Sequence, residues 1–166
     1  MSTVSVLLMK KSDIIILFDI DNTLFNTLRL KESELKIFEI YEEVKETLVE
    51  LSTVAKLGIL SQGQIAFQEK KLRETNIAQY FFEEHKHIVE YKIDVMKEVF
   101  ERYHNKAKVY FIDDWIEMLR FAKKTDPSVV TIWMKRGEYA QVQEESNDFI
   151  PDAVVTNLRG VIPLIN

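Results

Sequence analysis

The chain has no cysteine among its 166 residues. Disulfide bonds, thiolate zinc sites and cysteine nucleophiles are therefore excluded, and a reduced, cytoplasmic setting is the expectation. Glycine and proline are scarce, at four and three residues, so each one is an informative mark of a turn or a break. No apolar run approaches the roughly 20 residues of a membrane-spanning helix, and we expect no membrane partner.

Acidic residues outnumber basic ones by 27 to 22, and the formal net charge is −5. This balance argues against nonspecific binding to nucleic acid. A phosphorylated substrate would have to be met by a few well-placed cations or by a metal ion. The length favours one domain over residues 1–166, burying roughly 70% of its unfolded surface. The apolar Val4–Met9 is too short for a signal core, and its lysines follow it, so we expect a strand or a frayed tail there.

Apolar runs alternate with amphipathic segments along the chain, which predicts βαβ units around a mostly parallel sheet. The expected fold class is α/β, a doubly wound, Rossmann-like three-layer sandwich. The chain is expected to end in an edge strand at 151–155 and a helix or turn at 158–165. The other predicted strands are 14–18, 54–60, 107–112 and 129–134, and the predicted helices are 32–51, 65–76, 93–104 and 115–124.

Two carboxylates follow the first of these strands with one residue between them. The run 14–18 is apolar throughout and rich in β-branched residues, as in a strand buried on both faces. Asp19 and Asp21 come directly after it, and ligands of parallel sheets bind beyond the carboxyl ends of the strands. This spacing is typical of a phosphoryl-transfer site.

Further polar groups fall where the other predicted strands end. Ser61 and Gln62 follow the second strand, Lys92 precedes a helix, and Asp113 with Asp114 ends a later strand. A carboxylate such as Asp19 can attack phosphorus if the repulsion between the two anions is neutralised. Magnesium does this with oxygen ligands, which Asp19 and the acidic pair supply.

The remaining groups complete a candidate reaction. Asp21 would serve as general acid and then as general base, which requires a pKa raised toward the working pH. Ser61, with adjacent backbone N–H groups, and Gln62 would hold the phosphate, with Gly63 allowing a turn into a helix N-terminus. Lys92 would add positive charge near the same oxygens. Thr23 would bind substrate or satisfy local backbone groups.

These motifs resemble those of the haloacid dehalogenase superfamily, whose first motif is hhhhDxDxT. Four segments carry the resemblance in order and cover most of the chain: 18–24 for the first motif, 57–63 with its downstream helix for the second, 91–94 for the third and 109–114 for the fourth. The resemblance implies a haloacid dehalogenase-like fold and a magnesium-dependent phosphatase. The proline that often follows the third-motif lysine is Ile93 here.

The resemblance also implies roles for individual residues. Asp19 would be the nucleophile, and Asp21 the acid/base and a metal ligand through its backbone carbonyl. Asp114, with Asp113, would complete the metal site. Members of the superfamily often have a further acidic residue four positions after this aspartate, where this chain has Met118. Glu117 is the alternative acidic residue for the metal site.

The spacing of the motifs bears on the substrate. The 38 residues from Thr23 to Ser61 and the 31 from Ser61 to Lys92 each accommodate little more than a helix and a strand. Members of the superfamily insert cap domains in these intervals, so the chain resembles those with little or no cap. An open site would accept a small or a macromolecular phosphorylated partner, or would be closed by a second copy of the chain.

Other functions stay open from the sequence. A phosphotransferase would use the same intermediate, and a non-catalytic phospho-binding or regulatory module would use the same groups. Halide removal is disfavoured because a halide leaves without the proton that Asp21 would supply. Trp115 is interpreted as core or as a contact to a base or sugar, and Arg136 as a surface residue. His85 and His87 are interpreted as part of an exposed loop.

Overall fold

The computed structural model describes residues 11–143 and 148–165, so the expectation for Val4–Met9 lies outside the described residues. Six parallel strands form one sheet in the order β3-β2-β1-β4-β5-β6. The strands are β1 (Ile14–Phe18), β2 (Lys56–Gln62), β3 (Lys86–Val89), β4 (Lys108–Asp113), β5 (Val130–Met134) and β6 (Ala153–Val155). The α-helices are α1 (Thr27–Glu32), α2 (Val44–Leu51), α3 (Ile65–Glu74), α4 (Lys92–Tyr103), α5 (Ile116–Thr125) and α6 (Gly137–Val142). Short 3-10 segments are η1 (Lys11–Asp13), η2 (Ala78–Tyr80), η3 (Glu83–His85) and η4 (Leu158–Leu164).

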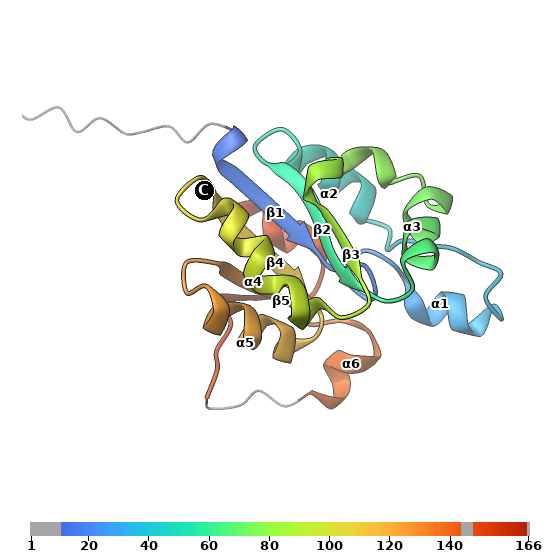
Figure 1. Ribbon diagram of the computed structural model, residues 1–166. Helices are drawn as coiled ribbons and strands as arrows, with labels where there is room; N and C mark the ends of the chain where they lie inside the picture. Colours follow the sequence, from blue (N-terminus) through green and yellow to red (C-terminus); the bar gives the residue numbers. More distant parts are fainter. Residues whose placement is uncertain (1–10, 144–147, 166) are drawn as a thin grey trace, which may run out of the picture.

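The central strand β1 is buried on both faces, which explains its unbroken apolar sequence. Ile14, Ile16 and Phe18 belong to one core cluster, which α2 and η4 share. Ile15 and Leu17 point to the opposite face, into a cluster with α4 and α5. Figure 1 shows these helices on the two sides of the sheet. The expected three-layer α/β fold is therefore confirmed.

The order of the strands gives the carboxyl end of β1 a particular place in the sheet. The chain leaves β1 for β2 on one side and later returns to β4 on the other. The strand order therefore reverses at β1, between β2 on one side and β4 on the other. Such a switch point is where doubly wound folds bind ligands. In register, Phe18 aligns with Ile59 of β2 and Ile112 of β4. The residues that follow these three positions are thus brought to one place.

The helix predicted over 32–51 is wrong as a single helix. The structure has α1 before it and α2 within it, separated by an irregular segment. Glu34 and Leu35 adopt positive φ angles of 56° and 65°, which an α-helix does not allow. The apolar residues Phe38, Ile40 and Tyr41 nevertheless pack against the core. The apolar spacing in this segment comes from a loop that packs against the core. The periodicity of apolar residues alone does not distinguish such a buried loop from an amphipathic helix.

The exposed loop predicted around His85 and His87 is also wrong. His87 lies in β3, which pairs with β2 at the sheet edge, and His85 is only 9% exposed. The Tyr103 hydroxyl lies 3.0 Å from His85 Nδ1 and 3.2 Å from His87 Nε2. This hydroxyl serves both imidazoles, so two histidines among charged neighbours are accommodated inside the fold.

The C-terminal part agrees with the predicted edge strand and turn, which are β6 and η4. The α6 helix after β5 was not predicted; the sequence suggested only a turn at Arg136 and Gly137. None of the helices in the described part of the chain combines the length and apolar character needed to cross a membrane.

Candidate active site

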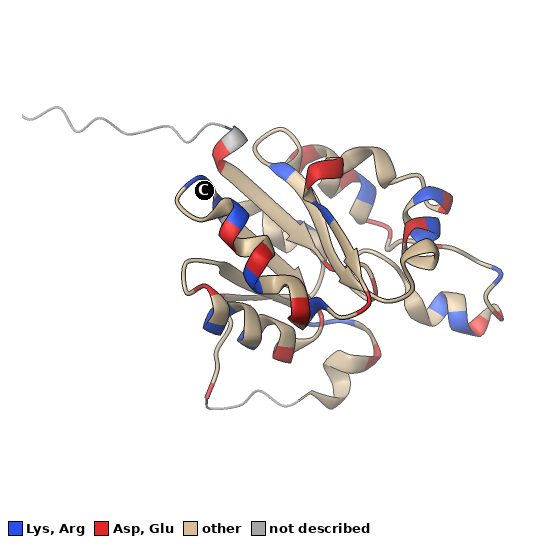
Figure 2. Ribbon diagram, viewed as in Figure 1, with Lys and Arg blue, Asp and Glu red and all other residues tan. Residues whose placement is uncertain are grey.

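Three carboxylates and one lysine meet at the carboxyl end of the sheet, where Figure 2 shows acidic segments beyond largely uncharged strands. Asp19 follows β1, Asp113 ends β4 with Asp114 next to it, and Lys92 begins α4. Lys92 Nζ lies 2.8 Å from Asp19 Oδ1 and 2.5 Å from Asp113 Oδ2. All four residues are buried. The structure thus brings together four residues that are up to 95 positions apart in the sequence.

The charges in this cluster do not balance. Burial raises the pKa of Asp19 to about 7, because the Lys92 ammonium only partly offsets burial and the neighbouring carboxylates. Burial, together with Asp19 and Asp113, raises the pKa of Asp114 to about 9. Burial would lower the pKa of Lys92, but its two carboxylate partners outweigh burial and raise it. One ammonium therefore faces an excess of carboxylate groups.

The acidic residues have the composition of a site for a hard cation. One carboxylate oxygen each from Asp19, Asp113 and Asp114 lies within 4.8 Å of the others. Magnesium prefers oxygen ligands of this kind. The Oδ1 atom of Asn22, in the adjacent loop, is buried without a hydrogen-bond partner. The donor set and the unbalanced charge both fit Mg²⁺.

Glu117, the alternative acidic residue, lies elsewhere. Its carboxylate is 3.5 Å from Arg120 on the same helix, and its side chain is 52% exposed. Met118, at the position where an acidic residue was expected, is buried in the core. Among the described residues, Asp113 and not Glu117 joins the carboxylate cluster.

The loop after β1 is tightly folded and tied to the second acidic pair. Asn22 has a φ of 57°, a left-handed conformation that asparagine tolerates better than most residues. Its side-chain amide donates to Asp114 Oδ2 at 3.0 Å. Thr23 is fully buried and its Oγ1 has no hydrogen-bond partner. The Thr23 hydroxyl thus does not satisfy local backbone groups, and Thr23 does not line the cavity described below.

Asp21 is held by three donors, of which the sequence indicated none as its partner. Its carboxylate accepts from Thr27 Oγ1 at 2.8 Å, Gln68 Nε2 at 2.9 Å and Lys71 Nζ at 2.6 Å. Burial alone would raise the pKa of Asp21, but Lys71 and the other donors lower it. A raised pKa was expected for a general acid. In this structure Asp21 is a carboxylate.

The second-motif residues are linked to Asp21 by Gln68 of α3. Gln68 Nε2 lies 3.3 Å from Ser61 Oγ and 2.9 Å from the Gln62 carbonyl, in addition to its contact with Asp21. Ser61 is fully buried, whereas Gln62 is half-buried and lines the cavity. Lys92 N donates to Gln62 Oε1 at 3.4 Å. Gln62 therefore joins the second and third motifs.

Arg136 is a central structural residue and not the surface residue suggested by the sequence. Its Nε donates to the Asn22 carbonyl at 3.1 Å, and its Nη2 donates to the Thr23 carbonyl. Nη1 pairs with Glu43 Oε1 at 2.5 Å, and both side chains are 11% exposed. The guanidinium also lies 3.7 Å from the centre of the Tyr41 ring. Arg136 therefore clamps the loop that carries Asp21 to the end of β5.

A cavity of about 330 Å³ opens above the cluster. It is of the size that binds small molecules. Trp115 lies on its wall and is not a buried core residue, while Trp133 is fully buried in the core. The lining residues are Asp19, Asp21, Asn22, Thr27, Lys31, Gln62, Lys71, Lys92, Asp113, Asp114, Trp115, Glu138 and Tyr139.

Six of these wall residues were missed by sequence reasoning: Asn22, Thr27, Lys31, Lys71, Glu138 and Tyr139. They come from the loop after β1 and from α1, α3 and α6. Lysine and glutamate on amphipathic helices look like ordinary solvent-exposed positions. The Lys71–Leu72 pair lies in the segment that resembles the second-motif region, and that was the one signal available for the residues on helices.

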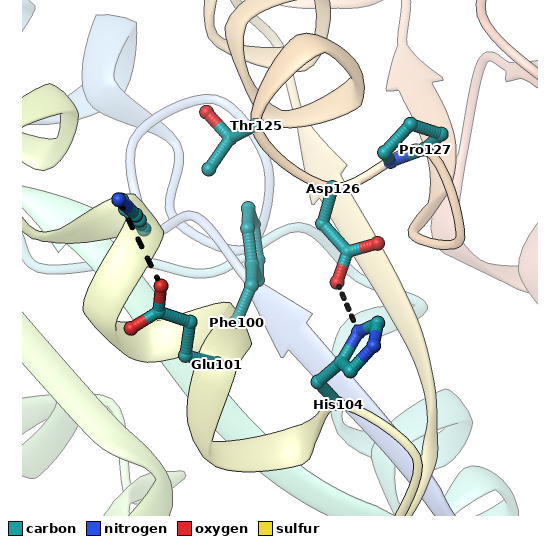
Figure 3. A pocket seen from close by; sticks show the side chains of 7 residues that line it. Phe100, Glu101, His104, Thr125, Asp126 and Pro127 are labelled. Carbon is teal, nitrogen blue, oxygen red and sulfur yellow. Dashed lines mark hydrogen bonds and ion pairs between the residues drawn. The ribbon is translucent and has the colours of Figure 1, made fainter.

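A second cavity of about 310 Å³ lies between the last turns of α4 and α5, at the other end of the sheet (Figure 3). His104 Nδ1 and Asp126 Oδ2 are 3.5 Å apart on one side of it. On the other side Glu101 pairs with Lys97 at 4.0 Å. Its polar groups are paired with one another along an exposed groove, and it shares no lining residue with the carboxylate cavity.

Comparison with known proteins gives structural but not sequence matches. No protein-family model and no curated protein sequence matches the chain. Among solved structures, a protein of Burkholderia xenovorans LB400 described as a haloacid dehalogenase-like hydrolase has a TM-score of 0.76 and 21% identity, covering 92% of this chain and 96% of that one.

Two further structures agree with this likeness. YfnB from Bacillus subtilis, described as a HAD-hydrolase bound to magnesium, has a TM-score of 0.69 at 14% identity, covering 95% of this chain and all of that chain. A protein from Clostridium difficile described as a phosphatase has a TM-score of 0.65 at 18% identity, with coverage of 95% and 100%. The chain therefore has the haloacid dehalogenase-like fold.

Proposed function

We propose that this chain, which has the haloacid dehalogenase-like fold, is a magnesium-dependent phosphatase that hydrolyses phosphate monoesters through an aspartyl-phosphate on Asp19. One observation carries the proposal. Asp19 lies on the wall of the cavity, in contact with the Lys92 ammonium and close to two further carboxylates. A nucleophile, a cation for the phosphoryl oxygens and an oxygen-rich site for Mg²⁺ are thus in one place.

The first step would be attack by an Asp19 carboxylate oxygen on phosphorus, with cleavage of the bond between phosphorus and the ester oxygen. Lys92 holds positive charge beside Asp19 and favours its ionised form. Magnesium held by Asp19, Asp113, Asp114 and the Asp21 carbonyl would supply further positive charge at the phosphoryl oxygens. The departing alkoxide takes a proton from Asp21.

The second step would be attack of water on the aspartyl-phosphate, with Asp21 accepting the proton that the water loses. Phosphate is released and the Asp19 carboxylate is restored. Asp21 is a carboxylate in the structure, which suits it as the base. For the first step its pKa must rise, and a bound phosphoryl dianion opposes the effect of Lys71 by placing negative charge nearby.

Thr23, Ser61 and Gln62 would support the phosphate site. Gln62 lines the cavity and would contact the phosphate, with its position set by Gln68 and Lys92. Ser61 and Thr23 are buried beneath this surface and would act mainly through the backbone around them. The partner is a phosphorylated compound in a reducing, cytoplasmic setting, and the substrate-binding part is a single core domain without a sizeable cap.

The proposal is tested by rapid-quench measurement of phosphate release from 4-nitrophenyl phosphate with MgCl₂. Wild type should show a burst of 4-nitrophenol. It should also carry a phosphoryl group on Asp19, detected by mass spectrometry of the acid-quenched protein. Asp19→Asn should lose turnover and label, whereas Asp94→Asn, an exposed aspartate on α4, should keep both. No turnover by wild type across a broad panel of phosphate esters would overturn the proposal.

The same experiment distinguishes hydrolysis from transfer, the second use of such an intermediate. If the labelled protein is stable in water and loses its label only when an alcohol is added, with the phosphoryl group recovered as the phosphate ester of that alcohol, the enzyme is a phosphotransferase. Release at the same rate without an alcohol supports the phosphatase.

A further inference from the structure

Two exposed aromatic rings stand at the mouth of the carboxylate cavity. Trp115, directly after Asp114, and Tyr139 of α6 both line it. Their rings are nearly parallel, with an interplanar angle of 12° and centroids 6.4 Å apart. Trp115 is 38% exposed and Tyr139 is 55% exposed. Large aromatic faces are usually buried, so an exposed pair beside a reactive site indicates a contact surface for a ligand.

Both rings are held by the residues that build the reactive centre. Trp115 N donates to Asp113 Oδ1 at 2.8 Å, and the other oxygen of Asp113 accepts from Lys92. The backbone of Trp115 is therefore linked to Lys92 through Asp113. Tyr139 is carried by α6, which begins at Gly137 with a φ of 79°. A Cβ at Gly137 would lie 2.6 Å from Asn22 Cγ, so α6 packs directly on the first-motif loop. The aromatic wall is therefore in place before a ligand arrives, which limits the entropy cost of binding.

Other residues on the cavity wall are polar. Lys31 Nζ of α1 pairs with Glu138 Oε2 of α6 at 2.5 Å, and both side chains are about half exposed. Thr27, also on α1, lines the same cavity. Exposed ion pairs contribute little stability and exchange partners easily. A ligand with a flat apolar ring and a polar edge would match both the aromatic and the polar residues of this wall.

Resting on the proposed function, we infer that the substrate is a phosphate monoester whose alcohol carries a flat aromatic ring, which stacks on the Trp115–Tyr139 pair while the phosphate lies at Asp19. The cavity of about 330 Å³ holds both parts. The aromatic pair is then a specificity element, and Lys31 with Glu138 contacts the polar edge of the ring or its substituents.

A pair of esters separates stacking from simple hydrophobicity. In 2-phenylethyl phosphate and 2-cyclohexylethyl phosphate the same two-carbon chain joins the ring to the ester oxygen, so the leaving alkoxides are closely matched. The cyclohexyl ring is at least as apolar but cannot stack face to face. We expect kcat/KM with MgCl₂ to be about five- to tenfold higher for the phenyl ester, with most of the difference in KM.

Variants then assign the preference to the two rings. Trp115→Leu and Tyr139→Leu should each reduce the ratio of the two kcat/KM values toward one, while Trp115→Phe and Tyr139→Phe should retain most of it. The ratio is taken within one protein, so partial misfolding of a variant cancels. Phe82→Leu is the control, because Phe82 is similarly exposed, at 39%, but lies outside the cavity. That variant should keep the wild-type ratio.

Binding of the matching phosphonates, which are not hydrolysed, gives a second readout. The affinities are measured by isothermal titration calorimetry, because Trp115→Leu removes the exposed tryptophan on which a fluorescence titration would report. Wild type should bind 3-phenylpropylphosphonate, in which a methylene group replaces the ester oxygen, about five- to tenfold more tightly than its cyclohexyl counterpart, and Trp115→Leu should remove the difference. Equal affinities, or no detectable binding of either phosphonate, would overturn the aromatic preference even if both esters are hydrolysed. Lack of hydrolysis of both esters would instead count against the phosphatase proposal.

Discussion

The Lys71 ammonium lies 2.6 Å from Asp21 Oδ1, so the residue proposed to move protons is ion-paired in the structure. The Lys71 side chain is 6% exposed, and its Nζ is also about 5 Å from the centres of the Phe25 and Phe67 rings. A cation packed this way is held firmly. Lys71 therefore favours the ionised form of Asp21 before a substrate binds.

Replacing Lys71 should change the pH dependence of the reaction. As the acid of the first step Asp21 must be protonated in the enzyme–substrate complex, so the single-turnover rate constant at saturating enzyme falls as pH rises through the pKa that Asp21 has in that complex. Lys71 lowers the pKa of Asp21. Lys71→Met should therefore raise it and move the descending limb of the single-turnover profile to higher pH. The profile is measured with one ester over a range of buffers at constant ionic strength.

Lys70→Met is the matched control, since Lys70 is the exposed neighbour of Lys71 on α3. Its profile should overlay that of wild type. A Lys71→Met profile that also overlays wild type would show that Asp21 is not the group seen in this limb.

Removing a carboxylate from the cluster should weaken magnesium binding. Asp114 contributes one of three clustered oxygens and would be a direct ligand. Asp114→Asn should reduce Mg²⁺ affinity by at least about tenfold in isothermal titration calorimetry. Glu117→Gln should leave it unchanged, because Glu117 pairs with Arg120 outside the cluster. Equal losses in the two variants would contradict the assignment of the site.

Arg136 should matter for both stability and activity. Arg136→Ala leaves Glu43 without its cation in a largely buried place and releases the carbonyls of Asn22 and Thr23. We expect a loss of about 2–4 kcal/mol in the free energy of unfolding, measured with urea. At temperatures where the variant is folded, kcat should fall more than KM rises, because the loop carrying Asp21 is no longer clamped.

Arg159→Ala provides the comparison for Arg136. Arg159 forms an ion pair with Glu46 on the surface, where the two side chains are 61% and 74% exposed. Its loss should give no resolvable change in unfolding or in turnover. If Arg136→Ala behaves in the same way, the clamp has no role in the site.

His87 in the edge strand β3 should make the free energy of unfolding depend on pH. Burial, with Arg102 and His85 nearby, lowers the pKa of His87 to about 4 from an ordinary 6.5. Between these values the unfolded chain binds more protons than the folded one. This contribution to stability is therefore complete above pH 6.5 and is lost as pH falls toward 4.

His87→Gln removes this titration while keeping a side chain that can form a hydrogen bond with the Tyr103 hydroxyl. Between pH 7.5 and pH 5, wild type should lose about 1–2 kcal/mol more stability than the variant, allowing for the partial exposure of His87. His104→Gln, at an exposed position, should follow wild type. Urea unfolding at the two pH values measures the difference, and parallel losses in wild type and His87→Gln would contradict the prediction.

Much of the site could be predicted because each of its parts has a local signal. An apolar run followed by Asp19 and Asp21 marks a strand end, and the same holds for the run before Asp113. Parallel strands place their carboxyl ends together, so convergence follows from the fold class. Lys92 was found through its place in the ordered set of motifs.

The wall of the cavity could not be predicted in this way. Lys31, Glu138 and Tyr139 lie on short helices whose sequences resemble solvated surface. Their role depends on where α1 and α6 sit above the sheet, and neither of these short helices was predicted. The histidines of the edge strand were misjudged for the same reason, since their partner Tyr103 is distant in sequence.

The sequence by itself determined the α/β class, the strand ends and the residue types at the reactive centre, because burial on two faces requires continuous apolar runs and chemistry requires particular groups at their ends. Only the tertiary structure decided which charges meet. The pairing of Lys71 with Asp21, the clamp by Arg136 and the aromatic wall of Trp115 with Tyr139 depend on side chains brought together across the fold. Charge and stacking act over a few ångströms in space, and distance along the chain does not reveal them.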